Sequence, residues 1–294
     1  MRGKNAMPLV LQARAKVNLL LDVLGRREDG YHELSTVLQS IALSDVLEFR
    51  PARYLRVTSD HPALPVGTAN LAGRAAAALA ATCGRDEGAD IRIIKRIPVA
   101  AGLGGGSADA AAALVGLNSL WQLGLSPDEL HQVAATVGSD VPFCLSGGTA
   151  LATGRGEILT PLSPLPPWWI ILVKPFFAVS TAAVYQAYCP EAVPAHPDTG
   201  AMLAAVGRRD RAGIAVKMAN VLETVTLAAY PVLREIKEHL LRLGAEACLV
   251  SGSGPTVFAL FAGRSAAEAA YERRSEFSGD VFLTRLADAG IIQA

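Results

Sequence analysis

Four glycines followed by a serine lie in residues 98–107, Pro-Val-Ala-Ala-Gly-Leu-Gly-Gly-Gly-Ser. Glycine has no Cβ, so backbone N–H groups in such a segment can approach an anion closely. The alanine-rich run that follows predicts a helix, whose N-terminus would add unpaired N–H groups and the positive end of a dipole. The segment therefore predicts a phosphate cradle, although a flexible turn capped by Ser107 is the alternative explanation of the same pattern.

Two better-known phosphate loops do not match this segment. A P-loop needs Lys-Ser or Lys-Thr after its last glycine, whereas Gly106 is followed by Ser107 and Ala108. A dinucleotide fingerprint aligned on Gly102 and Gly104 needs glycine or alanine at position 107, which is serine. No acidic residue ends a second strand roughly 20 residues later either. NAD binding and P-loop chemistry are therefore disfavoured.

Two charged residues elsewhere could take part in chemistry. Lys16 and Asn18 are two positions apart in an alternating apolar pattern, so on a strand both would lie on one face. Asp140 lies in the tight, apolar-flanked segment at residues 138–143, directly after a predicted helix. Each also has an ordinary structural explanation, because lysines on strands are commonly solvated and aspartates in such loops commonly cap helices or close turns.

Composition indicates a globular protein. The 294 residues are 51% hydrophobic, which is enough for a substantial core and suggests two domains. Because 27 basic residues balance 27 acidic ones, no overall field attracts nucleic acid or an anionic membrane. The apolar stretch at residues 168–173 is too short to span a bilayer, and no cleavable leader is apparent. We expect a cytoplasmic protein without nucleic-acid or membrane partners.

Cysteine and histidine spacing predicts neither a metal site nor disulfides. The four cysteines at positions 83, 144, 189 and 248 show no CxxC spacing and lie mostly among apolar residues, so we expect buried thiols. The five histidines show no HExxH spacing. A zinc site is therefore not expected.

Hydrophobic periodicity predicts an α+β protein. In the first half, strands are expected at residues 10–23, 36–43, 46–49, 55–59 and 89–97, and helices at 70–81, 107–123 and 126–138. In the second half, strands are expected at residues 168–173, 247–250, 256–261 and 281–286, and helices at 200–206, 211–216, 230–243 and 265–277. Ser107 and Ser126 would be the N-caps of their helices. The proline-rich segment at residues 160–167 is expected to separate an N-terminal domain, residues 1–162, from a C-terminal domain, residues 163–294.

Several motifs together resemble one family of kinases. The segment at residues 98–109 is similar to the ATP loop of the GHMP kinases, which act on galactose, homoserine, mevalonate and phosphomevalonate. Residues 15–19, Ala-Lys-Val-Asn-Leu, and residues 25–34, which contain Gly-Tyr-His, resemble the N-terminal signature of one branch of that family. Residues 251–256, Ser-Gly-Ser-Gly-Pro-Thr, are similar to the family's third glycine motif. The resemblance spans residues 10–262, with the motifs in the family's order.

The resemblance implies a fold and a reaction. The fold would be a two-domain α+β GHMP kinase fold, with a mixed-sheet ATP-loop domain and a smaller, ferredoxin-like C-terminal domain. The reaction would transfer the γ-phosphate of ATP to the C2 hydroxyl of a methylerythritol linked to cytidine diphosphate, in the non-mevalonate route to isoprenoids. Asp140, at the family's catalytic aspartate, would orient the hydroxyl and accept its proton. Lys16 would stabilise that carboxylate and offset charge on the moving phosphoryl group.

The family's nucleotide-binding positions fall on the glycine-rich segment and two residues outside it. They are Asn70, Lys95, Pro98, Ala101, Gly102, Leu103, Gly104, Gly105, Gly106 and Ser107. The Ser107 hydroxyl would be available to Mg²⁺. Asn70 and Lys95 match the family's adenine contacts, although an asparagine there could simply cap a helix and the lysine could be solvated. Asp109 would repel phosphate unless it faced away or bound metal, and as a first-turn acid it would favour the helix dipole.

The family's substrate positions include an aromatic pair. Tyr31 and His32 match the cytidine-binding residues, and Tyr185 would close the opposite face of the base where relatives carry phenylalanine. Asn18 and Thr181 are polar candidates for the methylerythritol or the phosphates.

Two alternatives remain open. One is a GHMP kinase for another small alcohol, such as mevalonate, homoserine or a sugar, which the Gly-Tyr-His segment disfavours. The other is a non-catalytic sensor with this fold, which would have no need of both Lys16 and Asp140. A monomer and a homodimer are both compatible with the sequence.

Overall fold

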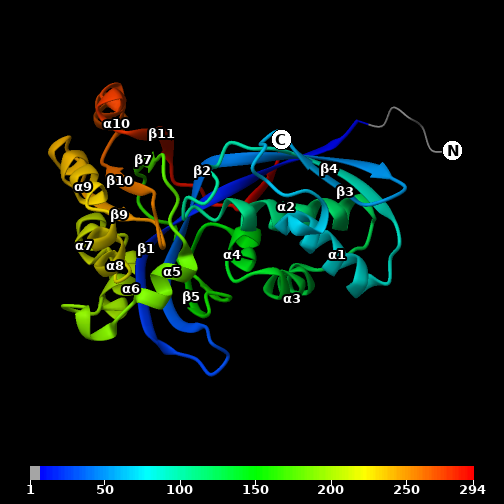
Figure 1. Cartoon of the computed structure of the whole chain (residues 1–294), viewed down its shortest axis with the longest axis horizontal. Coiled ribbons are helices and arrows are strands. Elements are labelled where there is room, and N and C mark those ends of the chain that lie inside the picture. Colours follow the sequence, from blue (N-terminus) through cyan, green and yellow to red (C-terminus); the bar gives the residue numbers. More distant parts are fainter. Residues whose placement is uncertain (1–6) are drawn as a thin grey trace.

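Two long antiparallel strands, β1 (Leu9–Arg26) and β2 (His32–Ala52), run through the centre of the larger of two sheets (Figure 1). The computed structural model describes residues 7–294. Register shifts interrupt the pairing after Arg14, after Asn18 and after Val23. Such bulges bend a strand and re-aim its side chains, and two of them flank Lys16 and Asn18.

The remaining elements of the first half are β3 (Arg56–Ser59), α1 (Leu71–Cys83), β4 (Gly88–Ile94), α2 (Gly105–Leu120), α3 (Pro127–Val137), α4 (Val141–Ser146), β5 (Thr149–Gly154) and β6 (Ile158–Pro161). Those of the second half are β7 (Trp169–Pro175), α5 (Thr181–Ala187), α6 (Thr199–Gly207), α7 (Arg211–Lys217), β8 (Ala219–Asn220), α8 (Glu223–Ala229), α9 (Val232–Arg242), β9 (Ala247–Val250), β10 (Val257–Phe261), α10 (Arg264–Glu272), β11 (Gly279–Arg285) and β12 (Ile291–Gln293). None of the helices in residues 7–294 has the length and apolar character needed to cross a membrane.

The larger sheet is mixed. Its strand order is β12-β1-β2-β4-β3, with β5 and β6 continuing from the other half of β2 and β8 beside β1. The β3–β4 and β1–β8 pairs are parallel, and the others are antiparallel. Helices α1 to α4 lie on one side of this sheet (Figure 1). Strands β8 and β12 belong to this sheet although they come from the second half of the chain. The sheet therefore crosses the expected domain boundary after residue 162, which stays a prediction.

The smaller sheet has the ferredoxin-like topology that the family resemblance implies. Its order is β11-β7-β10-β9 and all pairs are antiparallel, while α9 precedes β9 and α10 connects β10 to β11. One face packs Ile171 and Val173 against Leu233 and Ile236 of α9. Residues of the opposite face, such as Leu172, belong to the main hydrophobic core instead. The two sheets therefore share one core, and α+β is confirmed.

Most expected elements are present, with two corrections. The expected strands at residues 36–43 and 46–49 are parts of the single strand β2, because Ser44 and Asp45 do not interrupt the pairing with β1. The helix expected to begin at Ser107 begins at Gly105, with Gly104 in the left-handed conformation as N-cap. Ser126 is an N-cap as expected, and it forms a capping box with Glu129.

The expectation of buried thiols is confirmed for two of the four cysteines. All four are free; Cys144 and Cys248 are buried, Cys83 is half-buried and Cys189 is exposed. Burial raises the pKa of the Cys144 and Cys248 thiols above the usual range. Both therefore remain unreactive thiols near neutral pH.

Small residues let α2 lie close to the large sheet. The helix buries four consecutive alanines, residues 110–113, and Gly116 lies so close to β2 that a Cβ there would be 2.5 Å from Phe49 Cζ. Phe49 is fully buried. The position of α2, and with it the glycine-rich segment at its N-terminus, therefore depends on the absence of a side chain at residue 116.

We expect Gly116→Ala to lower the free energy of unfolding by about 1–3 kcal/mol, because overpacking against Phe49 outweighs the higher helix propensity of alanine. Gly207→Ala is the matched control, since Gly207 is also helical and a Cβ there would meet nothing within 4 Å. Denaturant unfolding of both variants measures the difference. Equal stability of the two variants would contradict the packing argument.

Candidate active site

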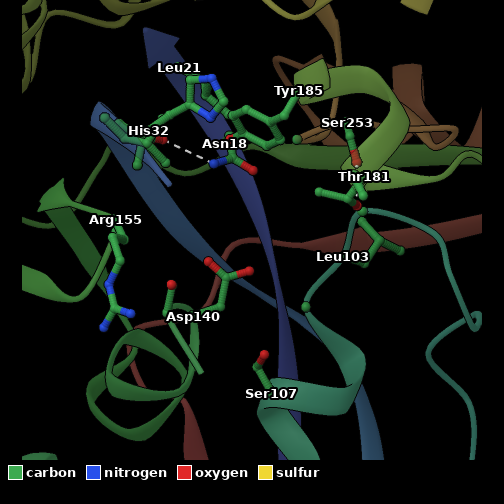
Figure 2. Close-up of a pocket in the computed structure, with 18 of the residues that line it drawn as sticks. Asn18, Leu21, His32, Leu103, Ser107, Asp140, Arg155, Thr181, Tyr185 and Ser253 are labelled. Carbon is green, nitrogen blue, oxygen red and sulfur yellow. Dashed lines mark hydrogen bonds between the residues drawn. The ribbon is translucent and has the colours of Figure 1, made fainter. Parts of the chain in front are cut away.

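A cavity of about 1130 Å³ lies where the glycine-rich segment, the β1–β2 hairpin and α5 meet (Figure 2). It brings together residues that are far apart in the chain. The expected site residues that line it are Lys16, Asn18, Tyr31, His32, Lys95, Pro98, Ala101, Gly102, Leu103, Gly104, Gly105, Gly106, Ser107, Asp140, Thr181 and Tyr185. Asn70 does not line it.

Lys16 and Asp140 form an ion pair inside this cavity. Lys16 Nζ is 3.3 Å from Asp140 Oδ2, and the side chains are 6% and 35% exposed. Lys16 Nζ also donates to Asn18 Oδ1 at 2.9 Å, so the expectation that these two side chains share a face is confirmed. Asn18 Nδ2 in turn donates to Thr36 Oγ1 at 2.9 Å. This chain of hydrogen bonds holds the lysine in one orientation beneath the carboxylate.

Asp140 is not used to stabilise its own helix. It precedes α4 as the N-cap residue, but its side chain makes no capping hydrogen bond. The carboxylate points into the cavity (Figure 2). The Asp140 side chain therefore does not cap α4, and its carboxylate is available to a ligand.

The glycine-rich segment is attached directly to the strand that carries Lys16. The backbone N–H of Lys16 donates to Leu103 O at 3.0 Å. Gly104 has φ +69°, and a Cβ there would be 2.9 Å from Lys16 Cγ. Only glycine satisfies both the backbone conformation and this close approach. The Ser107 hydroxyl, in the first turn of α2, points into the same cavity (Figure 2).

The third glycine motif supports the glycine-rich segment from the other sheet. Ser251 Oγ donates to Gly102 O at 2.9 Å, and a Cβ on Gly102 would be 2.2 Å from Ser251 O. Gly252 and Ser253 line the cavity, and the hydroxyls of Ser253 and Thr181 are 2.8 Å apart. The third glycine motif therefore lies against the glycine-rich segment and contributes to the lining of the cavity.

Asn70 and Lys95 have side chains that are engaged in structural contacts. Asn70 Oδ1 accepts from Ala72 N at 2.9 Å and caps α1, and its Nδ2 donates to Pro65 O at 3.1 Å. Lys95 Nζ pairs with Asp45 Oδ2 at 2.5 Å and with Asp109 Oδ2 at 2.8 Å. The assignment of both residues to the adenine stays a prediction, and these contacts give it no support.

Asp109 faces away from the cavity. It lies beyond the first turn of α2, and its side chain is 2% exposed. Burial, reinforced by the nearby Asp45 carboxylate, raises its pKa well above the usual range, although Lys95 opposes this change. Burial would lower the pKa of Lys95, but the Asp109 and Asp45 carboxylates outweigh it and raise that pKa. The expectation of a first-turn acid is wrong, because the helix begins two residues earlier than expected.

Aromatic side chains gather at the other end of the cavity. The rings of His32 and Tyr185 are 5.0 Å apart and tilted by 30°. The guanidinium of Arg155 lies 5.1 Å from the ring centre of Tyr31, which is 55% exposed. Burial, with a smaller contribution from Arg26, lowers the pKa of His32. The imidazole is therefore neutral near neutral pH, with one ring nitrogen that can donate and one that can accept.

Sequence reasoning did not single out every polar residue of the site, and Arg155 and Thr36 are two that it missed. Arg155 lines the cavity in the turn between β5 and β6, and its Nε is 3.2 Å from Glu157 Oε1. The Gly-Arg-Gly sequence around it is a turn signal next to a cation, which could have identified it. Thr36 carries no such signal, because its role arises from a hydrogen bond to Asn18 on the neighbouring strand.

Comparison with known proteins gives this geometry a family. Residues 70–148 match the profile described as GHMP kinases N terminal domain, and residues 202–279 match GHMP kinases C terminal. The chain therefore belongs to the GHMP kinases, which are ATP-dependent kinases.

Relatives across the whole chain carry a more specific name. The chain is 51% identical to a 4-diphosphocytidyl-2-C-methyl-D-erythritol kinase from Pelotomaculum thermopropionicum, over 95% of this chain and 98% of the relative. A kinase of the same name from Geobacillus thermodenitrificans is 50% identical over 95% and 97%. A crystal structure of a 4-(cytidine 5'-diphospho)-2C-methyl-D-erythritol kinase has a TM-score of 0.81 at 38% identity, covering 95% and 99%. A homoserine kinase from Cytophaga hutchinsonii, with a TM-score of 0.80, 19% identity and coverage of 100% and 99%, shares the fold.

We expect Gly104→Ala to lower kcat at least about tenfold, because its Cβ would displace the Lys16 side chain from Asp140. Gly124→Ala is the control, since Gly124 also has a positive φ (+71°) but a Cβ there would meet nothing within 4 Å. Both variants carry the left-handed backbone cost of about 1–2 kcal/mol, so steady-state kinetics at matched stability isolates the contact with Lys16. Equal kcat values for the two variants would show that the contact does not matter.

Proposed function

We propose that this GHMP kinase transfers the γ-phosphate of ATP to the C2 hydroxyl of 4-diphosphocytidyl-2-C-methyl-D-erythritol, a step of the non-mevalonate route to isoprenoids. One cavity contains the three parts that such a transfer needs: a glycine-rich segment at a helix N-terminus, the Lys16–Asp140 ion pair and an aromatic group that suits a nucleobase. This coincidence carries the proposal, and the names of the full-length relatives support it.

Asp140 orients the acceptor hydroxyl and takes its proton. Phosphoryl transfer passes through a loose transition state, so positioning and charge stabilisation contribute more than strong basicity. Lys16, held by Asn18 and by its ion pair with Asp140, places a positive charge beside the oxygen atoms of the moving phosphoryl group. The lysine also keeps the carboxylate facing the hydroxyl.

The glycine-rich segment holds the phosphates of ATP. Backbone N–H groups at the start of α2 have no partners within the helix, and the dipole of this 16-residue helix favours anions there. Magnesium supplies charge neutralisation on the phosphates when it is bound. Within residues 7–294 no group of three His, Cys, Asp or Glu side chains could hold a metal, which fits an ion that is held mainly by phosphates and water. Ser107 would be the protein ligand of the magnesium ion, whereas the Asp109 carboxylate forms an ion pair with Lys95.

The aromatic end of the cavity selects the cytosine. Tyr31 and Tyr185 stack on the two faces of the base, and the neutral imidazole of His32 reads an edge by hydrogen bonding. Asn18 and Thr181 also line the cavity, Asn18 next to Lys16 and Thr181 next to Ser253, and would contact the diphosphate or the methylerythritol. A cytidine-linked alcohol matches this set of groups better than mevalonate or homoserine, which have no base.

We expect Asp140→Ala to lower kcat by about 10²–10⁴, because the acceptor hydroxyl loses its orienting carboxylate, while the Kd for ATP changes less than about twofold. Single-turnover kinetics and equilibrium titration with ATP measure the two effects. Asp128→Ala, an exposed aspartate in the first turn of α3, is the control. Normal turnover by Asp140→Ala would refute the assignment of Asp140 as the group that accepts the proton of the hydroxyl.

We expect the wild-type chain to consume ATP with the cytidyl substrate and not with mevalonate or homoserine.

Tyr31→Ala should raise the KM for the cytidyl substrate about ten- to hundredfold, since base stacking contributes ~1–3 kcal/mol, and leave the KM for ATP unchanged. Tyr54→Ala is the matched control, because Tyr54 is also exposed and lies under an arginine, Arg53.

Three outcomes of these assays would contradict the proposal or part of it. Consumption of ATP with mevalonate or homoserine would favour a kinase for another alcohol. Absence of ATP consumption with all three substrates would favour a non-catalytic sensor. Equal changes in both KM values for Tyr31→Ala would place that ring outside the base site.

A further inference from the structure

Three ionisable side chains are buried together beneath the glycine-rich segment and take no part in the chemistry proposed above. Asp45 lies on β2, Lys95 directly follows β4, and Asp109 lies on α2. Their side chains are 0%, 3% and 2% exposed. A buried charge is costly unless it is paired, so the placement of three such groups in one cluster requires an explanation.

The cluster connects both ends of the glycine-rich segment. Lys95 precedes the segment and Asp109 follows it, and their side chains meet at 2.8 Å. Asp45 Oδ1 accepts from the backbone N–H groups of Arg96 and Ile97, at 2.6 and 2.8 Å, and so fixes the two residues that follow Lys95. The entry and the exit of the segment are thereby tied to each other and to β2.

Lys95 also lies directly against the segment. A Cβ on Gly105 would be 3.0 Å from Lys95 Nζ, so the ammonium sits against the first residue of α2. Its two carboxylate partners are 2.5 and 2.8 Å away. An ammonium that is buried and bound in this way is poorly placed to reach an adenine, and its effect on the nucleotide must act through the backbone of the segment.

The charges of the cluster argue against a role in stability alone. Two carboxylates share one ammonium, and buried ion pairs are often no more stabilising than apolar residues of similar volume. Asp109 Oδ1 has no hydrogen-bond partner among the described residues, so this site is not the arrangement that stability by itself would favour. Its distinctive result is a fixed separation between Lys95 and α2.

We propose that Lys95 is a positioning residue that holds the glycine-rich segment in its phosphate-binding conformation through Asp45 and Asp109. The inference rests on the proposed role of that segment in binding ATP, but not on the identity of the alcohol substrate. We call the contacts of Lys95 with Asp45 and Asp109 the clasp. Without the clasp, the N–H groups at the start of α2 would be free to move away from the phosphates, and part of the binding free energy of ATP would be used to order them.

The first test is Lys95→Met, which keeps an unbranched side chain only one atom shorter and removes the ammonium. We expect the Kd for ATP, titrated in the absence of the alcohol, to rise about tenfold or more, with the KM for the cytidyl substrate unchanged. Lys237→Met is the matched control, because Lys237 forms a half-buried ion pair with Glu223 at α9, outside the cavity. It should lower stability and leave the Kd for ATP unchanged. A wild-type Kd for ATP in Lys95→Met would overturn the proposal.

A double variant separates positioning from stability, and also serves if Lys95→Met folds poorly. Lys95→Met with Asp109→Asn removes one buried carboxylate along with the ammonium, while Asp45 keeps its two backbone donors. We expect its denaturation midpoint to return towards that of the wild type, with the Kd for ATP still raised about tenfold or more. Recovery of both stability and ATP affinity would show that Lys95 only neutralises charge, and would refute the clasp.

The result can be distinguished from failure of the proposed function. ATP is titrated without the alcohol, so a wild-type enzyme that ignores the cytidyl substrate would leave this test intact. If the wild-type chain does not bind ATP at all, the assignment of the glycine-rich segment fails; if the wild type binds ATP and Lys95→Met binds it equally well, the clasp alone fails.

Discussion

The site depends on one ion pair, between the buried Lys16 on β1 and the partly exposed Asp140 at the start of α4. Lys16 is almost wholly buried, and a buried ammonium must be paired to be tolerated. Its partner is therefore as much a requirement of the fold as of the chemistry. The same lysine donates its backbone N–H to Leu103 and fits against Gly104. The glycine-rich segment, the Asp140 carboxylate and strand β1 are thus held together by contacts of a single residue.

The second sheet completes the site. Ser251 and the glycines after it pack on Gly102, and Ser253 meets Thr181 at the start of α5. Since the cores of the two halves are continuous, the cavity is supported from both sides. A homoserine kinase shares this fold at 19% identity. Under the proposed function, the aromatic group at the hairpin and α5 would distinguish one alcohol from another.

Local rules predicted much of this architecture. Alternating apolar residues identified β1, and Ser126 with its proline and acids identified the start of α3. The same rules misplaced the start of α2, because a left-handed glycine replaced the expected serine cap. Short elements such as α4 and β8 were not predicted. Their few residues carry almost no periodicity, and their conformation comes from packing against β1 and α2.

The sequence by itself determined the glycine-rich segment, the ordered motifs and the shared face of Lys16 and Asn18, because backbone freedom and strand periodicity are local properties. Only the tertiary structure decided which charges meet. Lys95 and Asp109 each had an ordinary local explanation, yet both are buried against Asp45. A sequence does not reveal the desolvation of a side chain, because desolvation depends on what the fold packs around that side chain. Desolvation makes an unpaired buried charge costly, so buried charges form ion pairs.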